Sequence, residues 1–375
     1  MKILLTTGIF PPETGGPATL TPLIADALID RGHDVTVLTF SDHVQESVDE
    51  KYSFNLVRVV RGNKLSNYWR FFREVWDRID DVDFVYSLGW FTAGIPLSLA
   101  ARLKKKPYVV RVGGDYAWER YLSWGREPLT IREFYSTGVY KKGGLSVFFM
   151  LIKWVFSGAH HVVFNSDVQR ELYEKYYKLD SDKTITIYNP SPRLSVDSDR
   201  TLRKEIFFAG RLEEKNNVST LIDAFALADL DSFKLTIVGE GSQKKKLMDK
   251  VSDHGMEETI TFLLPMDKSQ LLKHMKDVYC VVLPSWTDVS PNTAYEALSL
   301  GVPLVITEEN YLPFRDSLNM MFDPHSSKQL SQILEHLGDE VEHHRAKQQI
   351  STIDFQHSLD DFIHKHVMLF NTIQS

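Results

Sequence analysis

Short runs of Val, Ile, Leu and Phe recur along the chain, separated by longer stretches in which apolar residues return every three or four positions. The short runs do not alternate apolar with polar residues, which is typical of parallel strands covered on both faces, and the longer stretches predict helices. In the first half, strands are predicted at 3–7, 34–40, 56–60, 83–87, 108–112, 162–165 and 184–188. In the second half they are predicted at 205–209, 234–238, 260–262 and 281–283, with a further strand from Pro303. Helices are predicted at 20–30, 96–103, 218–227, 243–253, 270–275, 294–300 and 355–370.

Residues 190–200 form a polar stretch with two prolines, which predicts a linker between two α/β series. A chain of 375 residues has room for two domains, which we place at 1–192 and 200–354. In open α/β sheets, ligands bind beyond the carboxyl ends of the strands. A cleft between the two domains is therefore the expected binding site.

The composition is that of a soluble globular protein, with 43% hydrophobic and 25% charged residues. A net charge of −7 argues against broad nucleic-acid binding. The single cysteine, Cys280, cannot form an internal disulfide, which suits a reducing cytosol. The first ten residues predict a strand and not a secretory signal, so we expect a cytoplasmic location.

Two stretches are rich in apolar and aromatic residues. The first, 145–156, is the most apolar run but is well short of the ~20 residues that span a bilayer. It predicts either a core helix or a membrane-surface patch. In such a patch the residues at headgroup level would be Lys141, Lys142, Lys153 and Trp154. The second, 68–76, interleaves aromatic and basic residues at helical spacing. It predicts either an amphipathic helix covering the sheet or a second membrane-surface contact at the inner face of a membrane.

The segment 284–305 carries two carboxylates in a strand–loop–helix arrangement: Asp288 in the loop and Glu296 in the helix. Gly301 is expected to end this helix in a left-handed conformation. An extended ligand with hydroxyl groups at its ends and an anion in the middle could meet both acids, while the helix dipole and free amides hold the anion. The alternative is that both acids are ordinary surface charges. The predicted helix start, with an N-cap followed by a first helical Pro, consists of Ser290, Pro291, Asn292 and Thr293.

Glycine and basic residues mark two further strand ends. Gly15 and Gly16 precede the first helix, where missing side chains would let a phosphate approach the backbone amides, or would simply allow a turn. Their spacing is not GxGxxG, which disfavours a dinucleotide dehydrogenase. Gly210 ends a strand, and Arg211 and Lys215 follow it. Such a basic pair can neutralise a diphosphate, or remain solvated.

Two more positions are candidates with open alternatives. Gly239 stands at a strand end and predicts either a plain turn or a ligand contact. Asp115 follows a strand and a glycine pair, and it either orients a sugar hydroxyl or acts as an N-cap or turn residue. No residues have the spacing of a metal cluster or of a Ser or Cys nucleophile, which favours metal-independent chemistry. The pairs at 180/182 and 197/199 have DxD spacing but lie in polar loops.

The second half resembles the retaining GT-B glycosyltransferases of family 4. Their EX7E signature is matched by Pro284, Ser285, Asp288, Glu296, Ala297, Gly301 and Pro303, with Asp288 where the family usually has Glu. Their G-R-L…K phrase is matched by Gly210, Arg211, Leu212 and Lys215. Asn216 replaces the usual Gly, no His stands near Asp115, and the usual Gly is absent around 264–266.

The resemblance implies a GT-B architecture, two Rossmann-like domains facing each other across a cleft, with the acceptor on the first domain and the nucleotide sugar on the second. It also implies that a C-terminal helix at about 355–375 packs back on the first domain. The implied reaction moves a sugar from a nucleotide-diphosphate sugar to a hydroxyl of a glycan or lipid-linked acceptor, with retention and without another cofactor.

The resemblance also implies roles for individual residues. Arg211 and Lys215 would stabilise the leaving diphosphate, Glu296 would hold the ribose, and Asp288 the donor sugar. The loop of Gly15 and Gly16 would contact the diphosphate and shape the acceptor site, and Gly239 would lie near the nucleoside. Two alternatives remain open: a nonhydrolysing nucleotide-sugar epimerase of the same fold, and a non-catalytic protein that binds a nucleotide sugar.

Overall fold

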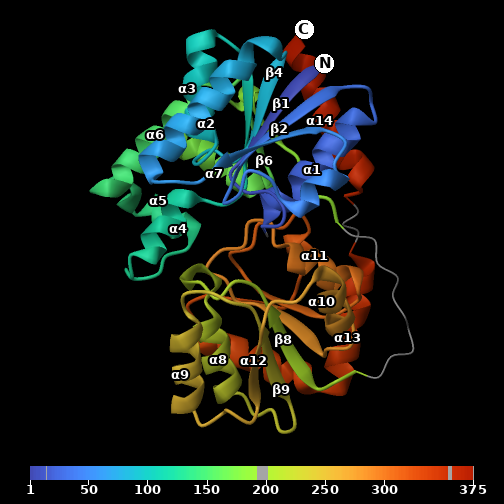
Figure 1. Cartoon of the computed structure of the whole chain (residues 1–375). Helices are drawn as coiled ribbons and strands as arrows, with labels where there is room; N and C mark the ends of the chain where they lie inside the picture. The colour runs from blue at the N-terminus through green and yellow to red at the C-terminus, as the bar shows by residue number, and fades with distance from the viewer. Residues whose placement is uncertain (14, 192–201, 354–356, 375) are drawn as a thin grey trace. The chain divides into compact units, whose positions relative to one another are not determined.

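The computed structural model describes residues 1–13, 15–191, 202–353 and 357–374, which form two compact α/β units (Figure 1). Unit 1 comprises Met1–Trp118, Tyr135–Asn189 and Leu359–Ser375, and unit 2 comprises Glu119–Phe134 and Pro190–Ser358. Most of the predicted linker, together with the DxD pair at 197/199, lies outside the described residues. Each half of the chain is thus built mainly into its own unit.

Unit 1 is built on a seven-stranded parallel sheet in the order β3-β2-β1-β4-β5-β6-β7. The first strand pairs with two neighbours, and its Ile3 lies opposite Val35 and Phe84. The predicted strands are confirmed to within two residues. The strands are β1 (Lys2–Thr7), β2 (Asp34–Ser41), β3 (Asn55–Val60), β4 (Phe84–Leu88), β5 (Tyr108–Val112), β6 (His161–Phe164) and β7 (Thr184–Thr186).

Helices cover both faces of this sheet, which explains why its strands are continuous apolar runs. The α1 and α14 helices lie on one side, and α2, α3 and α6 on the other (Figure 1). Phe362 and Phe370 of α14 join the core formed by Leu5 and Tyr86 of the sheet. The helices of unit 1 are α1 (Gly16–Ile29), α2 (Lys64–Arg78), α3 (Gly94–Lys104), α6 (Gly144–Gly158), α7 (Asp167–Tyr177) and α14 (Leu359–Gln374). Two further helices, α4 (Tyr116–Ser123) and α5 (Ile131–Ser136), lie mostly within residues 119–134 of unit 2.

Unit 2 is built on a six-stranded parallel sheet in the order β10-β9-β8-β11-β12-β13. Its strands send alternate residues to two separate cores. Ile206 and Phe208 of β8 join one core, and Phe207 and Ala209 join the other. The strands are β8 (Glu205–Ala209), β9 (Lys234–Val238), β10 (Ile260–Leu263), β11 (Cys280–Leu283), β12 (Leu304–Thr307) and β13 (Met321–Phe322).

The helices of unit 2 fill these two cores. Leu221 of α8 and Leu334 of α12 belong to the first core, and Ala297 of α11 and Met275 of α10 belong to the second. The helices are α8 (Val218–Leu227), α9 (Lys244–Asp253), α10 (Lys268–Met275), α11 (Asn292–Ser299), α12 (Ser327–Gly338) and α13 (Glu340–Thr352).

Residues 119–134 differ from the sequence-based expectation, because they pack with unit 2 and not with the domain at 1–192. The Ile131 N–H donates to Thr287 Oγ1 at 2.9 Å, and Arg132 pairs with Glu309 at 3.4 Å. These contacts join residues more than 150 positions apart, so no local pattern could have predicted them.

None of the helices in the described residues combines the length and the hydropathy that crossing a membrane requires.

Candidate functional site

The candidate site of unit 2 is built where β8 and β11 end. These strands are neighbours in the sheet, with Cys280 opposite Ile206 and Val281 opposite Phe207. Since parallel strands end at the same edge, the loop after β8 and the loop after β11 begin side by side. A backbone hydrogen bond of 3.0 Å from Trp286 N–H to the Lys215 carbonyl ties the two loops together.

The loop after β8 packs closely on the loop after β9. A Cβ atom on Gly239 would lie 1.9 Å from the Gly210 carbonyl oxygen, and one on Gly241 would lie 2.3 Å from the Leu212 carbonyl oxygen. The structure therefore accounts for Gly239 by backbone packing, as in the plain-turn alternative. Arg211 stands exposed on this loop and forms no ion pair with any described residue.

Lys215 lies in a short 3-10 turn, Glu214–Asn216, just before α8. Its Nζ forms an ion pair of 2.6 Å with Glu119 Oε1, and both side chains are partly buried. Glu119 belongs to the 119–134 segment and was not among the residues predicted from the sequence. The cation that we assigned to a diphosphate is therefore neutralised by a carboxylate in the ligand-free protein.

Backbone hydrogen bonds hold Asp288 in place. Its N–H donates to the Glu309 carbonyl at 2.9 Å, its carbonyl accepts from the Tyr311 N–H at 2.7 Å, and it forms a parallel bridge with Asn310. Its Oδ2 atom is buried and has no hydrogen-bond partner among the described residues. Burial raises the pKa of Asp288 to about 7, although a hydrogen bond from Ser285 and the charge of Lys215 lower it.

An acceptor oxygen that is buried and unpartnered is costly unless a ligand satisfies it. The Asp288 carboxylate therefore has the environment expected of a group that receives a hydrogen bond from a ligand hydroxyl.

Glu296 lies in the second turn of α11 and is buried. Its carboxylate is paired with Lys268 at the start of α10, whose side chain is more than half exposed. The exposed lysine can move aside, so Glu296 can exchange this partner for a ligand hydroxyl. The helix begins at Asn292 with Pro291 as its N-cap, which corrects the predicted N-cap at Ser290 by one residue. The reason is that Pro291 has extended backbone angles (φ −74°, ψ 116°) instead of helical ones.

The end of α11 is as predicted. Gly301 has φ 63°, in the left-handed region. The Gly301 N–H donates to the Leu298 carbonyl and the Val302 N–H to the Ala297 carbonyl, each at 2.9 Å. These two bonds form a Schellman motif, which fixes the direction in which the chain enters β12.

Gly15 and Gly16 belong to unit 1, while all other predicted donor-binding residues belong to unit 2. Both glycines are exposed, and α1 begins at Gly16. A Cβ atom on Gly16 would meet nothing within 4 Å. There is thus open space beside Gly16 in the first turn of α1, and the phosphate contact stays a prediction.

Asp115 lies inside unit 1 at the start of α4. Its side chain is fully buried, and its Oδ1 accepts the Trp118 N–H at 2.9 Å, which is an N-cap bond at the start of α4. Its Oδ2 accepts the hydroxyls of Tyr135 and Tyr173 at 2.6 and 2.9 Å. A carboxylate enclosed in this way holds a helix and two tyrosines, which supports the N-cap alternative for Asp115 over a sugar contact.

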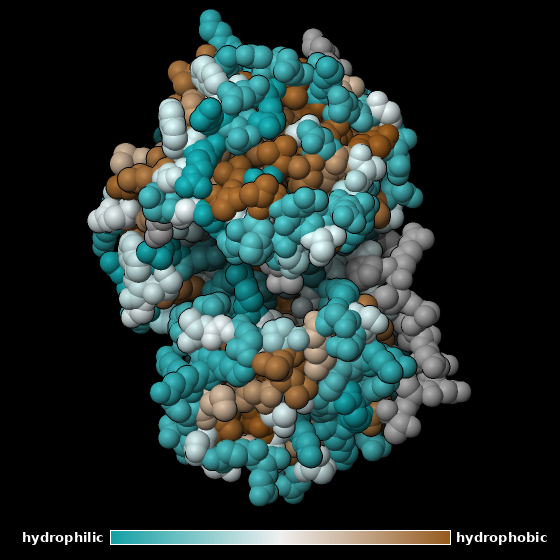
Figure 2. All heavy atoms as spheres, viewed as in Figure 1, coloured by the Kyte–Doolittle hydropathy of each residue, from teal (hydrophilic) through white to brown (hydrophobic). Residues whose placement is uncertain are grey.

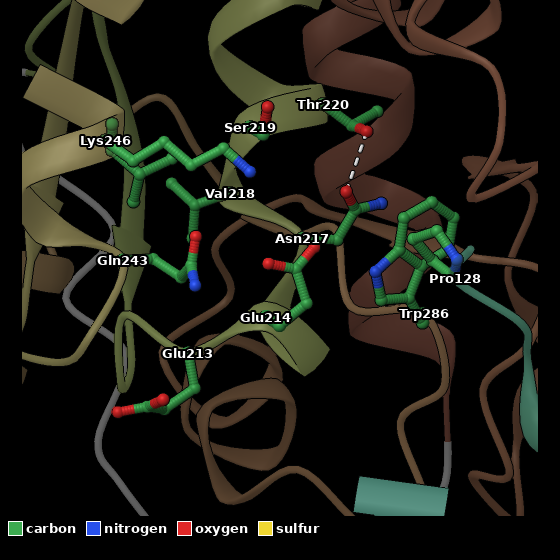
Figure 3. Close-up of a pocket in the computed structure, with 11 residues that line it drawn as sticks. Pro128, Glu213, Glu214, Asn217, Val218, Ser219, Thr220, Gln243, Lys246 and Trp286 are labelled. Carbon is green, nitrogen blue, oxygen red and sulfur yellow. Dashed lines mark hydrogen bonds between the residues drawn. The ribbon is translucent and has the colours of Figure 1, made fainter. Parts of the chain in front are cut away.

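A pocket of about 230 Å³ lies at the N-terminus of α8 (Figure 3). Trp286 lines it, so the pocket adjoins the loops of Lys215 and Asp288. The Trp286 Nε1 atom is buried and has no hydrogen-bond partner in the described part of the chain. The other lining residues are Pro128, Glu213, Glu214, Asn217, Val218, Ser219, Thr220, Gln243, Lys246 and Leu247.

This pocket was not predicted from the sequence. Asn217 Oδ1 accepts the Thr220 hydroxyl at 2.8 Å (Figure 3). Glu213 accepts the N–H and the hydroxyl of Ser242. An aromatic ring among hydrogen-bond donors and acceptors suits a polyhydroxylated ligand. Within the described residues, no group of three His, Cys, Asp or Glu side chains could hold a metal ion.

Family models match both halves of the chain. One, described as Glycosyltransferase Family 4, matches residues 14–191, and another, Glycosyl transferases group 1, matches residues 197–347. The chain belongs to the group 1/family 4 glycosyltransferases. The predicted fold, an α/β GT-B fold with two Rossmann-like domains, is thereby confirmed, and so is the expectation that this glycosyltransferase is an enzyme.

Individual relatives of this glycosyltransferase are distant. An uncharacterized glycosyltransferase of Methanocaldococcus jannaschii is 24% identical over 335 residues, which is 82% of this chain and 80% of that protein. A D-inositol 3-phosphate glycosyltransferase of Pseudarthrobacter chlorophenolicus is 25% identical over 207 residues. That match covers 50% of this chain and 49% of the relative, so the chain spans about half the length of several curated relatives that it matches.

Solved structures agree in fold. The structure of Anabaena HepE in complex with UDP-glucose has a TM-score of 0.76 at 16% identity, covering 99% of this chain and 100% of that one. Sucrose-phosphate synthase of Thermosynechococcus elongatus has a TM-score of 0.74 at 14% identity, covering 99% and 98%.

Proposed function

We propose that this glycosyltransferase moves a glycosyl residue from a nucleotide-diphosphate sugar to an acceptor hydroxyl, with retention at the anomeric carbon. One observation carries the proposal: the buried Asp288 Oδ2 has no partner among the described residues, and the loop that holds it is tied to the loop of the Lys215 cation by the bond from Trp286 N–H to the Lys215 carbonyl. A cation beside an unsatisfied acceptor fits a ligand that joins an anion to hydroxyl groups. The HepE structure, a complex with UDP-glucose, supports the same class of donor.

In the proposed reaction, the bond between the sugar carbon and the diphosphate oxygen breaks, and the acceptor oxygen forms the new bond at that carbon. The acceptor proton passes to the departing phosphate oxygen, so the protein does not have to supply a base. Arg211 and Lys215, with the first amides of α11, would stabilise the negative charge on the leaving group. Glu296 would accept the ribose hydroxyls once Lys268 has moved away.

We further propose that the acceptor is a glycan or a lipid-linked sugar at the inner face of a membrane. The exposed aromatic and basic side chains on one face of unit 1 support a location near lipid.

A thermal-shift screen tests the donor assignment. UDP-glucose, UDP-galactose, UDP-N-acetylglucosamine and GDP-mannose are added separately, and we expect one of them to raise the melting temperature. Glu296→Ala should remove that rise. Glu258→Ala, a change at an exposed glutamate on the same unit, should keep it. A melting temperature unchanged by every nucleotide sugar tried would count against the proposal.

Turnover separates transfer from the two alternatives. We expect nucleoside diphosphate to be released only when an acceptor is present. Conversion of the donor to another nucleotide sugar without an acceptor would indicate an epimerase, and binding without either reaction would indicate a non-catalytic protein.

A further inference from the structure

We propose that the α2–α3–α6 face of unit 1 docks on an anionic phospholipid surface. Here, the docking face means the exposed side chains of these three helices and of the lysines that flank α3 and α6. In unit 1, α3 packs against both α2 and α6, so their outer sides form one continuous surface (Figure 1).

Large apolar side chains are exposed on all three helices. On α2, Leu65 is 84% and Trp69 is 66% exposed. On α3, Leu103 is 60% exposed, and on α6, Met150 is 59% exposed. Hydrophobic side chains come to the surface over the side of unit 1 that carries these helices (Figure 2). Exposed apolar groups gathered on one face are typical of an interaction surface, whereas scattered ones are not.

Aromatic rings and cations alternate across this face. Trp69 stacks on Phe72, and Phe72 packs on Trp76. Lys104 of α3 lies 4.3 Å from the centre of the Trp76 ring, and Arg102 of α3 lies 4.9 Å from the centre of the Trp154 ring of α6. Amphipathic rings beside cations are the side chains that settle at the level of lipid headgroups.

The docking face carries more cations than acids, although the whole chain carries a net charge of −7. The two acids of α2, Glu74 and Asp77, are paired with Arg78 and Arg73 of the same helix. Residues 94–106 contain four cations and residues 137–166 contain three, and neither stretch contains an Asp or Glu. Lys104 is neutralised by Asp80 at 2.5 Å. Four other lysines are exposed and form no ion pair with the described residues: Lys105, Lys141, Lys142 and Lys153.

This charge pattern decides between lipid and a second copy of the chain. Two like-charged faces would repel each other across a dimer interface, whereas an anionic bilayer attracts each unpaired lysine and also accepts the apolar side chains. Docking on lipid is independent of the transfer chemistry, so it can be measured without donor or acceptor.

The test is cosedimentation of the full chain with vesicles. We expect binding to vesicles that contain phosphatidylglycerol, and little binding to pure phosphatidylcholine. Because the Debye length falls from about 10 Å at 0.1 M salt to about 3 Å at 1 M, binding should weaken with added salt. Equal binding to both kinds of vesicle would overturn the proposal.

Charge-reversal variants test whether vesicles bind at the docking face. Reversing Lys141, Lys142 and Lys153 to Glu should lower the partition coefficient at least about a hundredfold, given about 1 kcal/mol per cation near an anionic surface. The matched control reverses three exposed lysines of unit 2, with the same change in net charge, and should have a much smaller effect. The control residues are Lys204, Lys234 and Lys245.

The double variant Leu65→Ala, Trp69→Ala tests the contribution of the apolar side chains of the docking face. Both side chains are exposed, so we expect the variant to fold. We expect weaker vesicle binding and an unchanged oligomeric state by light scattering. The proposal would be wrong if reversing the three control lysines of unit 2 lowered vesicle binding as much as reversing the three lysines of the docking face. It would also be wrong if the wild-type protein were a dimer that the double variant dissociates.

Discussion

At the scale of single residues, two charged groups of the candidate site are already paired inside the ligand-free protein. Lys215 is paired with Glu119, and Glu296 with Lys268. A ligand that binds these groups must displace their internal partners. A phosphate would replace Glu119 at Lys215, and a hydroxyl group would replace Lys268 at Glu296. The internal pairs are therefore expected to set part of the affinity for the proposed donor.

Glu119→Gln should tighten binding of UDP about two- to fivefold, because it frees Lys215 from an ion pair of the strength usual at partly exposed sites. Lys215→Ala should weaken binding. Isothermal titration calorimetry measures both. Glu127→Gln removes the same charge from an exposed position of the same segment and should leave the affinity unchanged. Weaker binding by Glu119→Gln would mean that Glu119 assists the ligand.

The pKa of Asp288, raised by burial to about 7, predicts how stability depends on pH. A folded-state pKa above the unfolded value of about 3.8 means that the folded protein binds more protons between these values. The free energy of unfolding should therefore fall as the pH rises from about 4 to 7. Asp288→Asn should remove this contribution, which is at most about 4 kcal/mol at 1.36 kcal/mol per pKa unit.

Urea unfolding at several pH values measures this effect. The control is Asp316→Asn, at an exposed position of unit 2, which should keep the wild-type pH dependence. A slope that survives Asp288→Asn would assign the titration to another group. Since the proposed sugar contact needs the carboxylate, transfer should also decline as the pH falls below about 7.

At the scale of elements, the loops of the site owe their shape to close backbone contact and to helix ends. The loop after β8 packs against Gly239 and Gly241 of the loop after β9. The Schellman motif at Gly301 fixes the end of α11. Sequence patterns predicted these helix and strand ends well, because caps and glycines act over a few residues.

Gly239→Ala should lower the free energy of unfolding by at least about 2 kcal/mol, because its Cβ atom would lie 1.9 Å from a carbonyl oxygen of Gly210. Chemical denaturation measures the change. Gly16→Ala is the control, since a Cβ atom there meets nothing within 4 Å and should cost little. Similar stabilities for the two variants would show that the loops can separate without cost.

At the scale of the whole molecule, each unit is completed by a segment from elsewhere in the chain. Unit 2 takes in residues 119–134, and unit 1 takes in α14 from the C-terminus. In unit 1, His366 of α14 hydrogen-bonds to Tyr86 of β4 at 2.9 Å, and burial lowers its pKa to about 3. The neutral histidine thus fixes the helix on the sheet at ordinary pH.

The sequence by itself determined the alternation of strands and helices, the parallel sheets, and the positions of Lys215, Asp288 and Glu296 at strand or helix ends. These features follow from periodicity, capping and turn chemistry, which act over about ten residues. Only the tertiary structure decided that Asp115 is enclosed by two tyrosines, that Glu119 neutralises Lys215, and that Trp286 borders a pocket. These outcomes depend on contacts between residues 20 to 96 positions apart, which the packing of complete elements creates and no local pattern specifies.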